Sequence, residues 1–360
     1  MMILLSQLIA EYGDVLWRDY HDRLLPSHYR ALEAMKQCRT QQSLLFMAQC
    51  EDCCYQAFYP HSCGHRSCPH CQTQEGEQWL ARQRRKLLPV NYFMVTFTLP
   101  AQLRSLAWQH QRVIYSLLFS IGWEVLLSFG LKDKALSGKL GATAVLHTHS
   151  RSLDYHPHVH FVLPAGAINQ QQKLWRKKSG KYLFNHHNLA KVFKAKWFEA
   201  LKENKLWVNE TLPGKWVVDC KQVGQGDKAL VYLGKYLYRG VIQEKQIIKN
   251  QNGQVTFTYV DNTNTRRTRT LPGAEFLWLL LKHVLPRGFR RARDYGFLHG
   301  NSKRLIHLLH LILGFVTPVT QEVEKAQRKP FCCHHCGGFM KVIATRLPSI
   351  VRPQAVSGFT

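Results

Sequence analysis

The sequence predicts an α+β fold in which helices flank a central antiparallel sheet. Three runs rich in aromatic and β-branched residues, at 91–99, 141–149 and 156–164, have the composition of strands. The connection between the second and third runs is short enough for these strands to pair antiparallel. The segment 102–130 has the apolar spacing of a helix, and two Cys-x-x-Cys pairs near the N-terminus indicate a small metal-binding module beside the sheet.

The length of 360 residues allows two or three domains, and an apolar content of 45% is that of a globular protein. We expect an N-terminal helical and zinc-binding domain at 1–88, a catalytic domain at 89–310 and a C-terminal tail at 311–360 that carries a Cys-x-x-Cys pair. No secretory signal and no uninterrupted run of membrane-spanning length is evident. We therefore expect a protein of the reducing cytosol that does not associate with membranes.

The charge of the chain points to a polyanionic partner. It has 49 Lys and Arg against 23 Asp and Glu, a formal net charge of +26, and such an excess repels itself unless nucleic acid or a similar polyanion is near. Aromatic residues interleaved with the cations suit single strands, whose bases can stack. A merely basic soluble protein is the alternative. The cations that we expect to contact DNA are Arg84, Arg85, Lys235, Arg287, Arg290 and Arg291.

The remaining elements follow from hydrophobic periodicity and turn signals. Residues 1–37 have helical spacing, and Asn252-Gly253 lies between two strand-forming runs, which is a hairpin signal. The polar and basic segment 262–270 is predicted to be a loop, and 175–181 a basic turn. Further helices are predicted at 78–88, 189–204, 227–239, 275–285 and 303–315, and a short strand at 216–219.

The cysteines are clustered, which favours metal sites over a disulfide framework in a cytosolic protein. Cys50-x-x-Cys53 and Cys68-x-x-Cys71 together supply four thiolates, the number that a tetrahedral structural zinc site needs. Four protein ligands leave no open coordination position, so we expect a structural or binding role. Two interpretations remain for the cysteines and histidines left over. They form a second metal site, or they are ordinary buried thiols and surface histidines: Cys38, Cys63, His28, His61 and His65.

The stretch from Asp154 to Pro164 is the centre of the predicted chemistry. Side chains alternate along a strand, so His156, His158 and His160 share one face, and two imidazoles on a rigid strand form half of a metal site. A histidine-rich surface strand is the alternative. The third ligand remains open between His156, His147 and His149.

Tyr232 and Tyr236 lie four residues apart in the predicted helix 227–239, on one face and one turn apart. Such a pair alone is more often part of a core. Beside a divalent ion and a strongly basic surface, however, a tyrosine oxygen can attack a phosphate of DNA and form a covalent phosphotyrosine. The ester retains the bond energy, so rejoining the strand needs no ATP.

With these residues in place, the chain resembles a known family. His158-Val159-His160 is similar to the His-hydrophobe-His motif of HUH single-strand endonucleases, and with the tyrosine pair the chain resembles the two-tyrosine transposases of the insertion sequence 91 family. The resemblance spans roughly residues 28 to 300. Further similar stretches are Cys63-x4-Cys68-Pro69-x-Cys71, Trp79-Leu80, the run from Tyr92 to Pro100, the run from Tyr232 to Tyr236, and the run from His283 to Phe289.

The resemblance implies an N-terminal zinc-binding domain and an HUH-type central antiparallel sheet. It implies Mg²⁺ or Mn²⁺ at His158 and His160, and Tyr232 and Tyr236 as nucleophiles. The expected partner is single-stranded or hairpin DNA at transposon ends, cut through a 5′-phosphotyrosine in a rolling-circle-like course and without a small-molecule substrate. A nucleoid-associated cytoplasmic protein would fit. Members of the family vary in whether both tyrosines act, and the oligomeric state stays open.

Other functions use some of the same features. A rolling-circle replication initiator of a plasmid or phage would share the chemistry, although the sequence has no helicase-type phosphate loop. A non-catalytic zinc DNA-binding protein would account for the charge and the cysteines, but not for the histidine strand or the tyrosine helix. A transposase that uses a carboxylate triad is less well supported, because the sequence has no convincing acidic triad.

Overall fold

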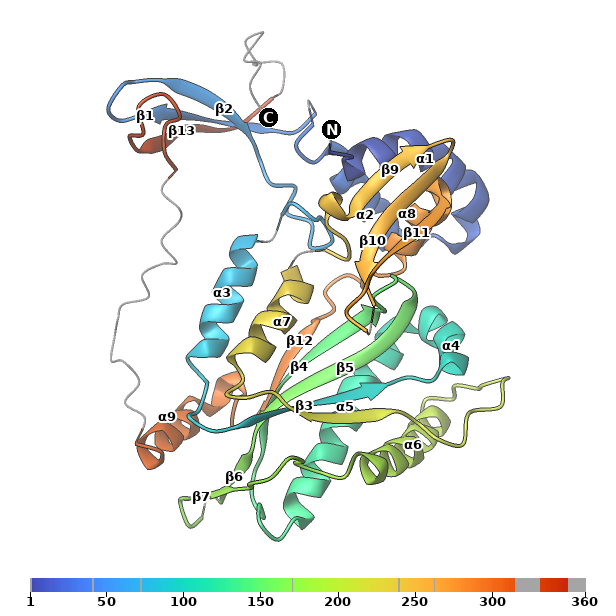
Figure 1. The fold of residues 1–360 in the computed structure, drawn as a ribbon, viewed down its shortest axis with the longest axis vertical. Helices are drawn as coiled ribbons and strands as arrows, with labels where there is room; N and C mark the ends of the chain where they lie inside the picture. Colours follow the sequence, from blue (N-terminus) through green and yellow to red (C-terminus); the bar gives the residue numbers. More distant parts are fainter. Residues whose placement is uncertain are drawn as a thin grey trace.

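The structure is a computed structural model of the chain, and it describes residues 2–40, 42–71, 73–169, 171–238, 240–261, 263–314 and 331–348. The chain forms both helices and strands, and the pairings between named strands are antiparallel. The predicted α+β class is therefore confirmed (Figure 1).

The central sheet has five strands in the order β12-β4-β5-β3-β8. The three predicted strands form its middle: β4 (Gly141–His149), β5 (Tyr155–Pro164) and β3 (Tyr92–Thr98). The edge strands are β12 (Ala292–Gly296) and β8 (Val218–Gln222). Because β5 lies between β4 and β3 and is bonded to both, the histidines that it carries sit on the most constrained strand of the sheet.

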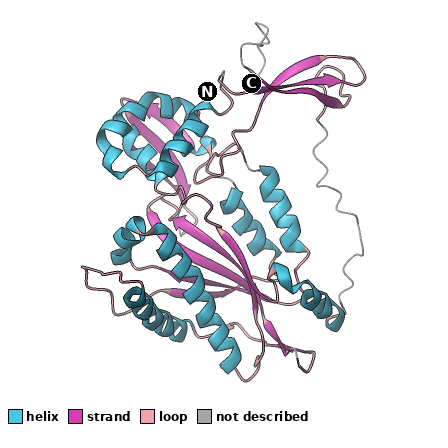
Figure 2. Ribbon diagram, turned by 180° about the vertical axis from the view of Figure 1, so that it is seen from behind, coloured by secondary structure: helices cyan, strands magenta, loops and turns pink. Residues whose placement is uncertain are grey.

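Helices α4 (Arg104–Gln109), α5 (Gln111–Lys132) and α6 (His186–Glu203) cover one face of this sheet (Figure 2). Alternation along β5 sends Val159 and Phe161 into the core beneath these helices, so the histidines between them point to the opposite face. Helix α5 is long and apolar enough to cross a membrane by length and composition alone, although Glu124 interrupts its apolar run. Its buried residues pack into the main core instead, so it is the core helix of the domain.

The opposite face carries α3 (Thr73–Arg84) and α7 (Asp227–Tyr238), which lie side by side in Figure 1. A small apolar cluster that includes Trp79, Leu230 and Leu233 joins the two helices to Val145 and Val162 of the sheet. The guanidinium of Arg84 also pairs with Asp227 at 2.7 Å. These contacts hold α7 against the face of the sheet that carries the histidines.

A second core joins the N-terminal helices to residues 242–284. Helices α1 (Leu5–Tyr20), α2 (Pro26–Gln37) and α8 (Gly273–Leu281) pack there against a three-stranded sheet of β9 (Ile247–Gln251), β10 (Gln254–Val260) and β11 (Arg266–Pro272). The predicted loop at 262–270 is thus wrong in its second half. Strand β11 has no apolar alternation, and it becomes a strand because its backbone pairs with β10 along seven residues.

Two segments far apart in the sequence form one small sheet. Strands β1 (Leu45–Cys50) and β2 (Gln56–Pro60) make a hairpin, and β13 (Met340–Leu347) pairs with β1. None of these three strands was predicted from the sequence. The other elements are the hairpin β6 (Gly166–Asn169) and β7 (Leu174–Lys177), where a basic turn was expected, the helix α9 (Lys303–Ile312), and four short 3₁₀ turns at 21–23, 101–103, 244–246 and 300–302.

Arg66 joins the loop after β2 to residues 285–289. Its guanidinium donates to the carbonyl oxygens of Leu285, Pro286 and Phe289 at 2.8–2.9 Å. Nearby, the buried carboxylate of Glu244 lies 2.7 Å from His70 and accepts the backbone N–H of Leu5. These contacts hold the loop 61–71 against residues 285–289. They also connect it, through Glu244, to the start of α1.

Candidate active site and metal centres

Three histidines come together on the face of the sheet opposite the main core. Pairing of β4 with β5 sets His147 directly across from His158, and His160 lies two residues further along β5 on the same face. One ring nitrogen of each of the three lies within 4.8 Å of the others, which is close enough for one ion to bind all three. The structure thus groups His147, and not His156 or His149, with the predicted pair.

Neighbouring groups fix the orientation of these rings. The Oγ1 of Thr96 lies 2.8 Å from Nδ1 of His160, across the β3–β5 pair. The Nδ1 of His158 lies 2.7 Å from the carbonyl oxygen of His156, so it must carry the proton and leave the lone pair on Nε2. The Nε2 of His160 is buried and has no hydrogen-bond partner among the described residues. This donor set fits a divalent cation.

Burial keeps these imidazoles neutral. Desolvation lowers the pKa of His158 to about 4 and takes the pKa values of His147 and His160 well below the ordinary range for histidine. Mutual repulsion between neighbouring imidazoles lowers them further. Only a neutral imidazole can act as a metal ligand, so the cluster is in the ligating form at neutral pH.

The two other candidates for the third ligand are engaged elsewhere. The Nδ1 of His156 lies 2.7 Å from the guanidinium of Arg104. The ring of His149 packs on that of His283, with centroids 5.2 Å apart. His156 was expected to share the face of His158 and His160, and its ring does lie beside His158, but Arg104 holds it at the end of the strand.

Tyr232 on α7 faces the histidine cluster. Its ring centroid is 6.1 Å from that of His147 and 6.2 Å from that of His160, and the residue is 38% exposed. The backbone of Tyr236 lies in the same helix, one turn further on, but its side chain is outside the described part of the structure, as is that of Lys235. One of the two predicted tyrosines is therefore placed next to the histidines.

A cleft of ≈ 820 Å³ opens over this cluster. The three histidines and Tyr232 line one wall, and residues 257–261 of β10 and its turn line another. The half-buried Tyr259 and residues 240–243 also line the cleft. The site is thus concave, open on one side and bounded by both sheets.

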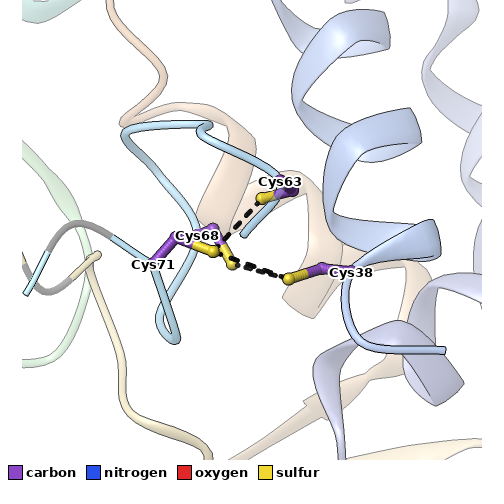
Figure 3. Close-up of side chains that lie close together, drawn as sticks. All are labelled: Cys38, Cys63, Cys68 and Cys71. Atoms are coloured by element: carbon purple, nitrogen blue, oxygen red, sulfur yellow. Dashed lines mark hydrogen bonds between the residues drawn. The ribbon is translucent and has the colours of Figure 1, made fainter. Parts of the chain in front are cut away.

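The cysteines separate into two sets of four. Cys38, at the end of α2, meets Cys63, Cys68 and Cys71 of the loop that follows β2 (Figure 3). The sulfur of Cys71 lies 3.7 Å from that of Cys38 and 3.6 Å from that of Cys63. A tetrahedron with Zn–S bonds of about 2.3 Å has edges of about 3.8 Å, so these thiols have the spacing of zinc ligands. Structural zinc fits this site.

The predicted grouping of the two Cys-x-x-Cys pairs is corrected by the structure. Cys50 and Cys53 lie at the tip of the β1–β2 hairpin, whereas Cys68 and Cys71 follow its base, and five strand residues separate the two places by about 16 Å. Cys50 and Cys53 instead meet Cys333 and Cys336. Cys38 and Cys63, which were left over, complete the first set.

The histidines near the cysteines are not part of either set. The Nε2 of His61 lies 3.0 Å from Thr345 Oγ1, and the Nδ1 of His65 accepts the backbone N–H of Ser67. His28 is fully buried between the rings of Trp108 and Trp278. Among the described residues, these three histidines therefore act in packing and hydrogen bonding.

The predicted DNA-contacting cations have different surroundings. Arg85, Arg287 and Arg290 are exposed, and Arg84 is tied to Asp227. Arg291 differs from the expectation, because burial lowers the pKa of its guanidinium to about 10 and its charge acts on His147 and His149. The residue is half-buried, with its Nε atom buried, and lies beside the site.

Two functional features were not foreseen. Thr96 orients His160, and Cys333 and Cys336 complete the second cysteine set. The Cys-x-x-Cys spacing of the latter pair is visible in the sequence, but nothing there indicates which other thiols they meet. Thr96 lies in a predicted strand, yet only the pairing of β3 with β5 brings it to His160.

Comparisons with known proteins relate two regions of the chain to transposases. The family model described as "Transposase zinc-binding domain" matches residues 8–99, and one described as "Putative transposase" matches residues 141–305. "Putative transposase y4qJ" of Sinorhizobium fredii (strain NBRC 101917 / NGR234) is 30% identical over 345 residues, which cover 89% of this chain and 86% of that protein. No solved structure matches the chain.

A second relative carries a more specific description. "Transposase for insertion sequence element IS801" of Pseudomonas savastanoi pv. phaseolicola is 27% identical over 336 residues, or 86% of this chain and 78% of that protein. With the fold and its sites, these matches place the chain among the DNA-processing enzymes. It belongs to the insertion sequence 91 family of transposases.

Proposed function

We propose that this transposase cuts and rejoins single-stranded DNA at the ends of its element through a covalent bond to Tyr232. The observation that carries the proposal is the position of Tyr232, which lines the cleft with its ring centroid 6.1 Å from that of His147 and 6.2 Å from that of His160. A nucleophile and a set of metal ligands on two rigid elements form a preorganised site.

His147, His158 and His160 would hold a catalytic Mg²⁺ or Mn²⁺ through their ring nitrogens. The bound cation would neutralise charge on a phosphate oxygen and orient the scissile bond. Thr96 and the carbonyl of His156 hold the imidazoles so that their lone pairs converge. Imidazole nitrogen suits Mn²⁺ better than Mg²⁺, so cleavage is expected to be faster with Mn²⁺.

The chemical step is a transesterification at phosphorus. The phenol oxygen of Tyr232 forms the new P–O bond while the bond to the 3′ oxygen of the preceding nucleotide breaks, and the phenol proton passes to that 3′ oxygen. The products are a 5′-phosphotyrosine and a free 3′-OH. Attack by a 3′-OH on the phosphotyrosine reverses the step and rejoins the strand.

The cleft suits a single strand. Tyr259 lines it and offers a ring on which an unpaired base can stack. Exposed cations at Arg85, Arg287 and Arg290 supply charge for the phosphates. We expect tighter binding to a single strand or hairpin than to a blunt duplex, with a log–log salt slope of about −0.7 for each phosphate neutralised.

A second tyrosine, Tyr236, follows one helical turn after Tyr232. If both act, one strand stays attached while the other is transferred, as a rolling-circle-like course requires. If Tyr236 has only a packing role, a single attachment and its reversal complete the reaction.

The decisive experiment detects the covalent protein–DNA adduct on a denaturing gel with a single-stranded element end and Mn²⁺. Tyr232→Phe removes only the nucleophilic oxygen, so loss of the adduct is expected, whereas Tyr182→Phe, at a tyrosine that is 63% exposed, serves as the matched control. Tyr236→Phe tells whether the second tyrosine takes part. An adduct that persists in the Tyr232→Phe, Tyr236→Phe double variant would overturn the assignment of α7.

A further inference from the structure

We propose that Cys50, Cys53, Cys333 and Cys336 bind a second zinc ion, which clasps residues 331–347 onto the β1–β2 hairpin. The transposase zinc-binding model matches residues 8–99 only, so it accounts for half of this ligand set at most. The site is independent of the reaction proposed for Tyr232.

The four thiols have the spacing of one tetrahedral ion. The sulfur of Cys50 lies 3.4 Å from that of Cys336, and the sulfur of Cys53 lies 3.8 Å from that of Cys333. One sulfur from each residue lies within 4.8 Å of all the others. The edge of a zinc–sulfur tetrahedron is about 3.8 Å, and a disulfide would need about 2.05 Å, so these distances fit a shared ion.

The backbone forms the same hydrogen-bonded turn at both Cys-x-x-Cys pairs. In the first, the carbonyl of Cys50 accepts the N–H of Cys54, and the N–H of Cys50 donates to the carbonyl of Tyr55. In the second, Cys333 makes the corresponding bonds with Gly337 and Gly338.

The residue after the second cysteine of each pair has a positive φ, 57° at Cys54 and 80° at Gly337. Two matched turns that face each other, each presenting two thiols, form the two halves of a Cys₄ zinc site.

The strands place the two turns together. Cys50 is the last residue of β1 and pairs with Met340, the first residue of β13, while the N–H of Glu51 donates to the carbonyl of Phe339. The apolar cluster under the site is small, with Ala48, Cys50, Cys333 and Met340 as its buried members. So small a core stabilises a three-stranded sheet poorly, and a metal ion supplies the missing stability.

The two cysteine sites differ in accessibility. In the proposed second zinc site, Cys53 and Cys336 are exposed. In the first site, Cys38, Cys68 and Cys71 are all buried. We therefore expect a chelator to remove zinc from the second site first and from the buried site later.

The test measures zinc per chain by native mass spectrometry of the full-length protein. Wild type should bind two ions, one for each cysteine set. Cys336→Ser and Cys53→Ser should each lose one of them. Cys332→Ser and Cys54→Ser are matched controls, because these exposed cysteines are direct neighbours of the ligands and belong to neither set. If wild type bound one zinc ion, or if Cys336→Ser bound two, the proposal of a second zinc site would be wrong.

A second measurement needs no variant and covers the case of a ligand variant that does not fold. Pulsed alkylation of zinc-loaded protein, read by peptide mass spectrometry, should modify Cys54 and Cys332 rapidly and spare Cys53 and Cys336, although all four are exposed. A brief chelator treatment should then expose Cys50, Cys53, Cys333 and Cys336 to alkylation together. Equal labelling of Cys336 and Cys332 before chelation would contradict a bound ion.

Discussion

The histidine cluster and the buried cysteine site are both places where side chains converge on one ion, but they are built in opposite ways. His147, His158 and His160 stand on neighbouring strands in the middle of a five-stranded sheet and face an open cleft. Cys38, Cys63, Cys68 and Cys71 come from a helix end and a loop, and three of the four are buried.

We infer different roles for the two sites from this difference. Three neutral imidazoles leave coordination positions open for a substrate oxygen, and the sheet keeps them in place with or without an ion. Four thiolates saturate a tetrahedral ion and leave no position for a substrate, and here an ion would tie one loop to Cys38 at the end of α2. We therefore expect changes at the histidines to affect chemistry and changes at the cysteines to affect folding.

The largest expected effect is on the reaction, from replacing a histidine of the cluster. A bound cation contributes several kcal/mol of charge stabilisation, and each 1.4 kcal/mol is about tenfold in rate, so His158→Ala or His160→Ala should slow adduct formation by about 10³-fold or more. The zinc content and the far-ultraviolet circular dichroism should stay at wild-type values. The exposed His187 provides the control variant His187→Ala. Normal cleavage by His158→Ala would remove the histidines from the mechanism.

The cysteine site should show the opposite pattern. Cys68→Ser is expected to lose one zinc and to lower the stability by several kcal/mol, which shifts the melting temperature by about 10 °C and reduces solubility before any direct effect on cleavage. Calorimetry together with zinc analysis measures both. Cys54→Ser, at an exposed cysteine outside both sets, should melt like wild type. If Cys68→Ser kept its zinc and its melting temperature, the site would not be structural.

A smaller effect should come from the residue that orients His160. Thr96→Val keeps the shape of the side chain and removes the oxygen that lies 2.8 Å from Nδ1, so Mn²⁺ should bind about 10–100-fold more weakly. The Mn²⁺ concentration needed for half-maximal cleavage reports this directly. Thr98→Val, two residues along the same face of β3, is the control. An unchanged Mn²⁺ requirement would mean that the sheet alone fixes the imidazole.

The smallest effect separates burial from metal binding. Burial lowers the pKa of His28 to about 4, as it does for His158, but among the described residues His28 is in no group of donors close enough to share an ion. A histidine with a lowered folded-state pKa stabilises the protein fully above about 6.5, and this contribution is lost as the pH falls from 6.5 towards 4. Between pH 7.5 and 5.5 the loss is about 1 kcal/mol.

His28→Phe keeps the ring between Trp108 and Trp278 and removes the titration. Its unfolding free energy in urea should fall by about 1 kcal/mol less than that of wild type between the same two pH values. The other buried histidines contribute equally to both proteins, so the comparison isolates His28. Identical slopes would mean that this histidine keeps its ordinary pKa.

The amino-acid sequence by itself determined the fold class and the middle of the sheet. Side-chain alternation and helical spacing are local features of the sequence. They predict the helix that carries Tyr232 and the strands at 92–98, 141–149 and 155–164. The position of His158 and His160 on one face of the strand follows from the same alternation and does not depend on the neighbouring strands. Strand β11 was missed because its residues have no apolar pattern and only β10 makes it a strand.

The tertiary structure alone decided which distant residues meet. His147 becomes the third histidine because the β4–β5 register sets it opposite His158, and a shift of one residue would turn it to the other face. Cys50 and Cys53 meet Cys333 and Cys336, not Cys68 and Cys71, because a hairpin holds its tip away from its base and β13 returns to pair with β1. Ligand spacing along the chain indicates that a metal is bound, but strand pairing decides which ligands share it.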